Sequence, residues 1–309
     1  MNRKLIAKNI EDFYLTNLNL LKPEKRFHLL SRLYLSTRNS KYKKLLNLYK
    51  SDLIPTNLEE FLKELLNNNY IDRHLLVEGK RSQYLQEYPE ISKYNKVFFL
   101  NFFLKQIYGI KIARIINKDL NKIQVLAYFN KLILDPDALR ILSSVAVNFL
   151  FQANRYLKLN KEKKLLNIIF RIVKNIDFNR MDDIEKKQLA YMVTHTIINI
   201  SDMYSNLAIN NPDMCEGLLL HLEEKMMPSI DSFTVDVLIE LLVCWKLLDR
   251  KSKYEKILLE IVLNAYKSET HYLVESKYEI THAVMNDLNG SEHRNILFIL
   301  LYKINGTRN

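Results

Sequence analysis

Apolar residues recur along this chain at the three- and four-residue spacing of an amphipathic helix. In one example, Phe27, Leu30 and Leu33 follow Pro23, a residue type that suits the first turn of a helix. Another example begins at residues 56–59 (Thr-Asn-Leu-Glu), which have the form of a capping box, and continues with apolar residues three or four positions apart. The pattern predicts an all-α fold.

The second half of the chain predicts helical hairpins. Their first helices recur about every 44 residues, a length typical of two-helix repeats. A hairpin of this kind needs a neighbour to cover its apolar face, so we expect stacked antiparallel hairpins that form an α/α repeat, either an open solenoid or a closed ring. The expected helix pairs are 137–156 with 162–175, 182–207 with 213–225, 232–248 with 254–266, and 275–288 with 291–304.

A strongly apolar stretch over residues 92–117 precedes these hairpins. Its apolar side chains point to several sides of a helix, which predicts a buried central helix or, alternatively, an interface between two copies of the chain. Residues 70–91 are less regular and contain Gly79 and Pro89, so we expect the boundary there. The predicted organisation is a basic helical region over 1–91 and a hairpin-repeat domain over 92–309.

The composition agrees with this fold and narrows the class of protein. Five Gly and six Pro in 309 residues are too few for many tight turns, which argues against sandwiches, barrels and glycine-rich phosphate loops. Two Cys cannot build a disulfide framework or a cysteine-based zinc site. The first residues lack the apolar core of a signal peptide, and no apolar stretch reaches the ~18 residues of a membrane helix. We therefore expect a soluble, cytoplasmic protein without a membrane span.

Positive charge is concentrated at the start of the chain. Of 46 Lys+Arg and 35 Asp+Glu in total, 12 and 3 respectively lie in residues 1–50. An anionic partner would meet this segment first, and its interleaved Phe and Tyr residues make nonspecific nucleic-acid binding one hypothesis. The alternative is a solvated helix face with the aromatic rings turned inward. The cations that would contact such a partner are Arg26, Arg32, Arg38, Lys41, Lys43 and Lys44.

One helical motif occurs twice in the second half. Residues 191–195 and 278–282 both read Tyr-x-x-Thr-His, and the two histidines lie 87 residues apart, which is two repeat lengths. Internal duplication explains this best. At about 100° per residue, Tyr191, His195 and Asp202 share one helix face, and Tyr278 and His282 share the matching face.

These polar stripes have a structural and a functional explanation. A duplicated hairpin would keep buried Tyr, Thr and His side chains as a hydrogen-bonded packing layer. In the functional explanation, His195 and His282 converge with Asp202 as metal ligands or acid/base groups, and Tyr191 and Tyr278 line the same ligand pocket. Convergence requires a closed or strongly curved arrangement of hairpins. No metal-binding spacing such as HExxH supports a metal, and the sequence assigns no cofactor.

The first motif continues into Ser201-Asp202-Met203-Tyr204, and with this continuation it resembles an uncharacterised bacterial family of all-helical proteins. That family repeats a Tyr-x-x-Thr-His helix that runs on into Thr-Asp-Phe-Gly. The resemblance covers about residues 185–290: His195 and Asp202 match with Ser201 in place of Thr, whereas the second copy departs after His282, where residues 287–290 (Asp-Leu-Asn-Gly) reach the glycine one residue early. Because the family has no established activity, the resemblance implies the importance of the His helices and no chemistry.

The remaining histidines each stand alone, which predicts surface or capping roles for His28, His74, His221, His271 and His293. Because no strong catalytic motif is present, the leading hypothesis is a helical-repeat binding or scaffold protein that holds a peptide, a protein or a small ligand in a groove or cavity. It could also form homo-oligomers. The first alternative is a metal- or His-dependent enzyme built on the duplicated Tyr/His/Asp stripes. The second is nonspecific nucleic-acid binding through residues 1–50.

Overall fold

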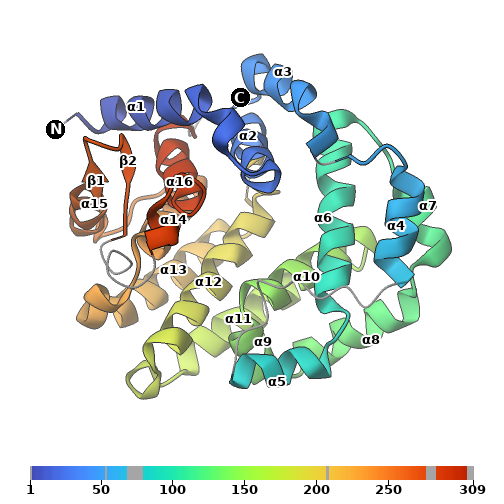
Figure 1. The fold of residues 1–309 in the computed structure, drawn as a ribbon. Coiled ribbons are helices and arrows are strands. Elements are labelled where there is room, and N and C mark those ends of the chain that lie inside the picture. The colour runs from blue at the N-terminus through green and yellow to red at the C-terminus, as the bar shows by residue number, and fades with distance from the viewer. Residues whose placement is uncertain (1, 53, 68–78, 207–208, 276–282, 305–309) are drawn as a thin grey trace. The chain divides into compact units, whose positions relative to one another are not determined.

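The structure is a computed structural model that describes residues 2–52, 54–67, 79–206, 209–275 and 283–304 (Figure 1). Within these residues the fold is all-α, as predicted, apart from one pair of two-residue strands. No helix in the described part is long and apolar enough to cross a membrane.

The α-helices, in chain order, are α1 (Arg3–Thr16), α2 (Pro23–Thr37), α3 (Ser40–Leu48), α4 (Leu58–Asn67), α5 (Lys80–Glu87), α6 (Ile91–Tyr108), α7 (Ala113–Asp119), α8 (Lys122–Ile133), α9 (Pro136–Leu142), α10 (Ser144–Tyr156), α11 (Glu162–Asn175), α12 (Asp183–Ile200), α13 (Pro212–Met226), α14 (Val235–Leu247), α15 (Glu255–Asn264) and α16 (Glu292–Lys303). Short 3-10 helices lie at Leu18–Leu20, Lys50–Asp52, Phe178–Arg180, Met227–Ser232 and Ala283–Asn286. The antiparallel strands are β1 (Tyr266–Lys267) and β2 (Tyr272–Leu273).

Contacts divide the chain into two compact units. Unit 1 comprises Met1–Ile54, Ser201–Pro212 and Glu223–Asn309, and unit 2 comprises Pro55–Ile200 and Asp213–Leu222. The N-terminal helices therefore belong with the C-terminal ones. The predicted boundary near residue 91 divides the chain differently and stays a prediction.

Helix α16 lies at the core of unit 1 and packs against α1, α2 and α14. All residues from Asn295 to Leu300 are at most 1% exposed, so the helix is covered on every side. Figure 1 shows α1 and α2 beside α16, although they come from opposite ends of the chain. Asn295 also connects α16 to the β1–β2 hairpin, because its Oδ1 accepts a hydrogen bond from the Leu273 backbone N–H at 2.8 Å.

In unit 2, α10 packs against both α6 and α12. Helix α6 is buried on several faces, as expected for the apolar stretch. The predicted 92–117 helix is in fact two helices, because Gly109 takes the left-handed conformation (φ 70°) that ends α6. The second piece is α7.

Other predicted helix bounds need correction for similar reasons. The helix expected over 137–156 is broken into α9 and α10 at Ser143, whose φ is 53°. The helix expected over 275–288 is also wrong in its described part. The Asn286 amide bonds to both backbone groups of Glu275, at 2.7 and 2.8 Å, whereas one helix would place these residues about 16 Å apart along its axis. Of the predicted hairpins, the pairs α10–α11 and α14–α15 lie side by side.

Unit 1 also contains a buried carboxyl group, Glu223, which is 1% exposed. Its oxygens accept hydrogen bonds from Trp245 Nε1 at 2.7 Å and from Ser252 Oγ at 2.8 Å. Burial raises the pKa of Glu223 from 4.5 to about 7, although these hydrogen bonds act in the opposite direction. The folded protein therefore binds a proton at the Glu223 carboxyl more tightly than the unfolded chain does. As a result, the contribution of Glu223 to the free energy of unfolding decreases as the pH rises from about 4.5 to about 7.

We predict that Glu223→Gln gains stability relative to the wild type as the pH rises, because the neutral amide has no charge to bury. The difference in free energy of unfolding between variant and wild type should grow by about 3 kcal/mol from pH ~4.5 to pH ~8. Urea unfolding at several pH values measures it. The matched control is Glu224→Gln, at an exposed neighbour in an ion pair with Lys253, where the change should stay below about 1 kcal/mol. A pH-independent difference for Glu223→Gln would contradict the prediction.

Candidate active site

The predicted His195 stripe lies in an amide-rich layer between α10 and α12. His195 Nδ1 is 3.1 Å from Asn148 Oδ1, and Asn199 Nδ2 donates to the same oxygen at 2.7 Å and to the His195 carbonyl at 2.8 Å. Gln152 Nε2 donates to Asn199 Oδ1 at 3.0 Å. The Tyr191 ring meets the His195 ring edge-on, with 6.2 Å between centroids. These contacts form a hydrogen-bonded layer of side chains between two helices, which is the arrangement described in the structural explanation of the stripe.

Asp202 does not continue the helix face that carries His195, which corrects the expected stripe. Helix α12 ends at Ile200, and the next turn is left-handed, with φ values of 51°, 54° and 69° at Asp202, Met203 and Tyr204. The Asn206 N–H closes this turn by donating to the Ser201 carbonyl at 2.8 Å. His195 belongs to unit 2, whereas Asp202 belongs to unit 1.

The second copy of the motif gives no structural test of convergence. Tyr278 and His282 both lie outside the described residues, so their place beside His195 stays a prediction. Among the residues that the structure describes, no group of three or more His, Cys, Asp or Glu side chains is placed to hold a metal ion.

A different pair of histidines comes together in unit 1. The rings of His28, on α2, and His293, on α16, have their centroids 5.5 Å apart and their planes tilted by 41°. Each ring meets a carboxylate through Nδ1: His28 lies 2.8 Å from Glu292 Oε1, and His293 lies 2.9 Å from Asp236 Oδ1. Because Asp236 stands in the first turn of α14, three helices build the site. We call these four residues the paired-histidine site.

The other ring nitrogen, Nε2, makes no hydrogen bond in either ring within the described part of the chain. The two side chains remain 25% and 31% exposed for His28 and His293, respectively. An imidazole that is oriented through Nδ1 and open at Nε2 has the arrangement of a histidine base or acid held by a third group. Neither Nε2 atom is held by a protein group in the described part of the chain.

The surroundings shift the pKa values of the two imidazoles in opposite directions. Burial, helped by the charge of Arg32, lowers the pKa of His28 to about 4. Burial also opposes a charged His293, but the hydrogen bond and charge of Asp236 outweigh it and raise the pKa of His293 above 6.5. The bonds from the two rings keep the pKa of Glu292 and Asp236 below their ordinary values in spite of burial. At neutral pH, His28 is neutral, whereas His293 holds its proton more tightly than an ordinary imidazole does. Such opposed shifts define acid and base roles in many enzymes.

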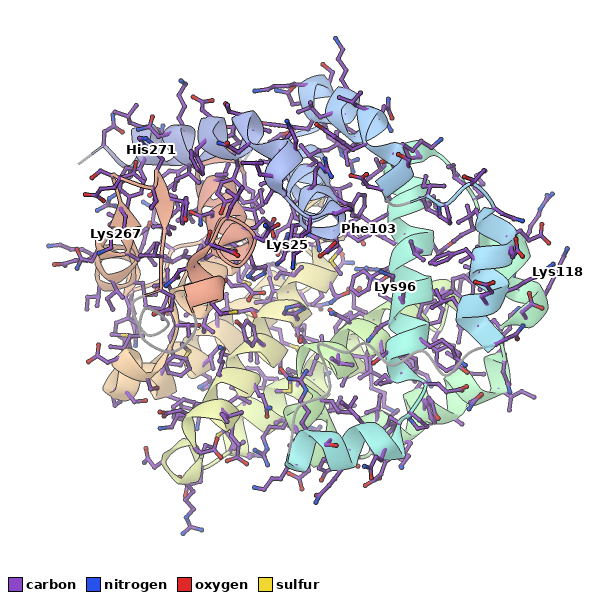
Figure 2. The ribbon with its side chains drawn as sticks, viewed as in Figure 1. Lys25, Lys96, Phe103, Lys118, Lys267 and His271 are labelled. Atoms are coloured by element: carbon purple, nitrogen blue, oxygen red, sulfur yellow. The ribbon has the colours of Figure 1, made fainter. Side chains whose placement is uncertain are left out.

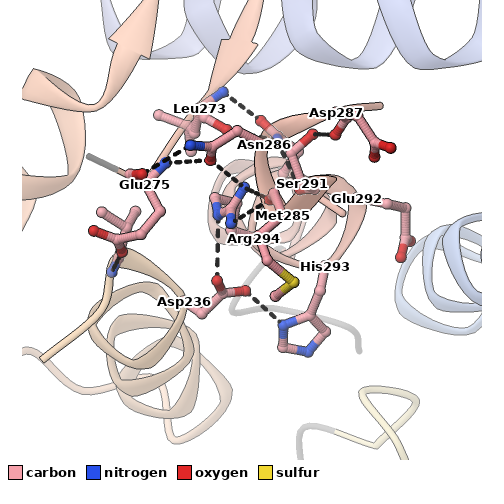
Figure 3. A network of polar contacts seen from close by, with 12 residues as sticks. Asp236, Leu273, Glu275, Met285, Asn286, Asp287, Ser291, Glu292, His293 and Arg294 are labelled. Carbon is pink, nitrogen blue, oxygen red and sulfur yellow. Dashed lines mark hydrogen bonds and ion pairs between the residues drawn. The ribbon is translucent and has the colours of Figure 1, made fainter. Parts of the chain in front are cut away.

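A buried guanidinium positions the second pair. Arg294 is 0% exposed, and its Nε donates to Asp236 Oδ2 at 3.2 Å. Its terminal nitrogens donate to the Met285 carbonyl at 3.1 and 2.9 Å, and one of them reaches Asn286 Oδ1 at 3.4 Å. Figure 3 shows the Asp236 carboxylate between Arg294 and His293. The carboxylate that orients His293 is thus itself fixed from the other side.

The first pair contains an unsatisfied oxygen. Glu292 is 0% exposed, yet its Oε2 has no hydrogen-bond partner among the described residues. The nearest cation, Lys25 Nζ, is 3.7 Å away, which is too long for a hydrogen bond. Buried carboxylate oxygens are bonded as a rule, so this oxygen is an exception among the described residues.

Tyr204 extends this polar region from the left-handed turn. It is 5% exposed, and burial together with the charge of Glu240 raises its pKa well above the ordinary value. The charges of Tyr204 and Glu292 also act on Arg32, whose pKa burial lowers. Each non-glycine residue in a left-handed conformation costs about 1 kcal/mol, and such strain is concentrated at functional sites.

His28 and His293 each stand alone in the sequence, which predicts surface or capping roles, whereas the structure places them side by side. A usable signal was nevertheless present. Residues 292–294 read Glu-His-Arg at the start of a helix whose next six residues include five apolar ones. At about 100° per residue these three side chains point to different sides, so a buried helix there needs polar partners on several sides.

Comparison of the chain with protein-family models, curated proteins and solved structures finds no match. The resemblance noted in the sequence stays a prediction, and the paired-histidine site is defined by its geometry.

We predict that the His195 layer stabilises unit 2. Asn199 is 0% exposed and joins Asn148, Gln152 and His195, so Asn199→Ala leaves buried polar groups unpaired. The free energy of unfolding, measured in urea, should fall by about 2–3 kcal/mol. The control Asn179→Ala changes an exposed residue and should cost less than about 0.5 kcal/mol. A neutral Asn199→Ala would argue against a structural layer.

We also predict opposite titration of the two site histidines. In NMR spectra of ¹³C-labelled histidine, His28 should titrate near pH 4 and His293 above pH 6.5. Asp236→Asn removes the negative charge that stabilises the imidazolium of His293 and should lower the pKa of His293. Exposed His271 lies outside the site, at the tip of the β hairpin (Figure 2). The assignment fails if His28 and His293 both titrate near 6.5.

Proposed function

We propose that this protein is an enzyme that transfers protons with His28 as general base and His293 as general acid. The observation that supports this most is that two imidazole rings lie next to each other, with 5.5 Å between their centroids, and that each ring is oriented by its own carboxylate. Proton removal and proton delivery can then occur in one step on the same bound molecule.

The proposed reaction class is displacement at an ester or phosphoester centre. Neutral His28 accepts a proton at Nε2 from the attacking water or hydroxyl, and the negative charge of Glu292 stabilises the imidazolium that forms. Protonated His293 donates its Nε2 proton to the leaving oxygen, and Asp236 holds the ring in place as its charge changes. The proton gained by His28 and the proton lost by His293 balance, and exchange with solvent restores both rings.

The sequence-based hypothesis of a binding or scaffold protein remains the alternative. Neighbouring helix pairs such as α10–α11 and α14–α15 are compatible with stacked hairpins, and a solenoid or a ring stays part of that hypothesis. We favour the enzyme because a scaffold does not require two histidines with opposed pKa shifts, and perturbed titratable groups of this kind gather at catalytic sites.

The proposal predicts hydrolysis of activated model substrates. We would test aryl esters, aryl phosphomonoesters and bis(aryl) phosphodiesters with the full chain. For the substrate class that is turned over, His28→Gln and His293→Gln should each lower kcat/KM by about 10²–10⁴-fold. The matched control, His271→Gln, should leave it unchanged.

The pH profile provides a second criterion. Activity needs a neutral His28 and a protonated His293, so kcat/KM should rise through pH ~4, stay high and fall at a pKa above 6.5. Asp236→Asn should shift the upper limb to lower pH, because it lowers the pKa of the acid. Turnover that survives both histidine substitutions would overturn the proposal, and ligand binding without any turnover would favour the scaffold hypothesis.

A further inference from the structure

Only part of the basic N-terminal segment faces solvent. Arg26 is used inside the fold, since it pairs with Asp52 at 2.9 Å and lies over the Tyr49 ring at 4.2 Å. Arg32 belongs to the polar region around Tyr204. Lys43 is half-buried. The cations of the predicted set that remain exposed are Arg38, Lys41 and Lys44.

These three cations lie close together where α2 leads into α3. Arg38 caps α2 in a left-handed conformation (φ 55°), Asn39 caps α3, and Lys41 and Lys44 lie three residues apart on α3. In the described part of the chain, none of the three forms an ion pair with a carboxylate, and residues 25–51 contain no Asp or Glu. Their charge is therefore directed at solvent. We call Arg38, Lys41 and Lys44 the α2–α3 basic surface.

The local arrangement is electrostatically unfavourable for the fold itself. The N-terminus of a helix carries partial positive charge and favours acidic residues, but α3 has none in its first turn and has lysines instead. Lys50, which follows α3, adds positive charge from the other end of the helix: burial and then the charge of Lys50 lower the pKa of Lys43. Bound anions would relieve this repulsion. Lysines at a helix N-terminus that no carboxylate within the fold neutralises indicate that their charge serves to bind a partner.

From this surface we infer a second site, independent of the proposed catalytic one: Arg38, Lys41 and Lys44 bind the phosphates of single-stranded nucleic acid. The Tyr34 ring lies beside this surface, 5.5 Å from the Arg38 guanidinium and 5.6 Å from Lys43 Nζ, and so adds an aromatic face between cations. Cations interleaved with an aromatic ring are typical of single-strand binding.

The chemistry of the surface favours nucleic acid over a lipid surface. A helix that lies in a membrane interface buries a broad apolar face, whereas around these cations only Leu48, at 70% exposure, is a strongly exposed apolar residue. The other exposed neighbours, Asn39, Ser40 and Asn47, carry amide or hydroxyl groups that can hydrogen-bond to phosphate. Helix α3 has nine residues and is thus about 13 Å long, which limits the contact to a few phosphates.

Three phosphate contacts give a quantitative expectation. Counterion release predicts that the logarithm of the association constant falls with the logarithm of salt concentration with a slope of about −2 for a single strand. Affinity should then drop about 20-fold between ~50 and ~200 mM salt. Fluorescence anisotropy of a labelled mixed-sequence single-stranded DNA dodecamer with the full chain measures it.

The decisive comparison uses two variants with the same loss of net charge. Arg38→Gln/Lys41→Gln/Lys44→Gln should bring the slope close to zero and abolish binding at low salt. The control Lys251→Gln/Lys256→Gln/Lys267→Gln removes three exposed lysines around α15, and Lys267 projects away from the ribbon in Figure 2. The control should keep the wild-type slope. His28→Gln should also bind normally, which separates this inference from the proposed enzyme.

Three results would overturn the inference. Equal loss of binding in both triple variants would mean that only the net charge matters. Tighter binding of a duplex of the same sequence, with a slope near −2.7, would reject the single strand as the ligand. Capture of the wild type by vesicles with anionic phosphatidylserine, without binding to the oligonucleotide, would assign the surface to lipid headgroups. Circular dichroism of each variant verifies that the helices are intact.

Discussion

The ion pair between Arg294 and Asp236 is the contact on which the candidate site depends. Arg294 is completely buried, and removing a guanidinium from water costs several kcal/mol unless its donors are satisfied. Here Nε bonds to Asp236 and the terminal nitrogens bond to the Met285 carbonyl, so the charge and the donors are compensated together. The pair connects α16 to α14, and the free side of Asp236 can then hold His293 in one orientation.

The position of α16 also explains how two histidine–carboxylate pairs meet. Glu292 and His293 are consecutive residues, so their side chains diverge by about 100° and reach different neighbours, α2 and α14. The buried run from Ile296 to Leu300 fixes the rotation of the helix, because any turn about its axis would expose apolar surface. The packing that buries the apolar residues of α16 therefore also determines where Glu292 and His293 point. The basic surface of α3 lies outside this network, and its cations face solvent.

Some features were predictable because they depend on neighbours in sequence. The all-α fold, the starts of most helices and the burial of α6 follow from apolar spacing, capping residues and few turn formers. Helix breaks were missed at Ser143 and after Ile200, where non-glycine residues take left-handed conformations. Such a conformation is unfavourable locally and is held by tertiary contacts such as the hydrogen bond from Ser143 Oγ to the Gln188 carbonyl. The spacing of apolar residues along the sequence gives no information about such tertiary contacts.

For the candidate site, too, some features follow from the sequence and others only from the tertiary structure. By itself the sequence determined that the protein is helical, that its positive charge lies in the first fifty residues, and that a Tyr-x-x-Thr-His string occurs twice. Only the tertiary structure decided which cations face solvent and which histidines meet. His28 and His293 are 265 positions apart, and each is an isolated polar residue until α2, α14 and α16 pack together. The opposed pKa shifts follow from burial and from charges on other helices, and neither exists before the chain folds.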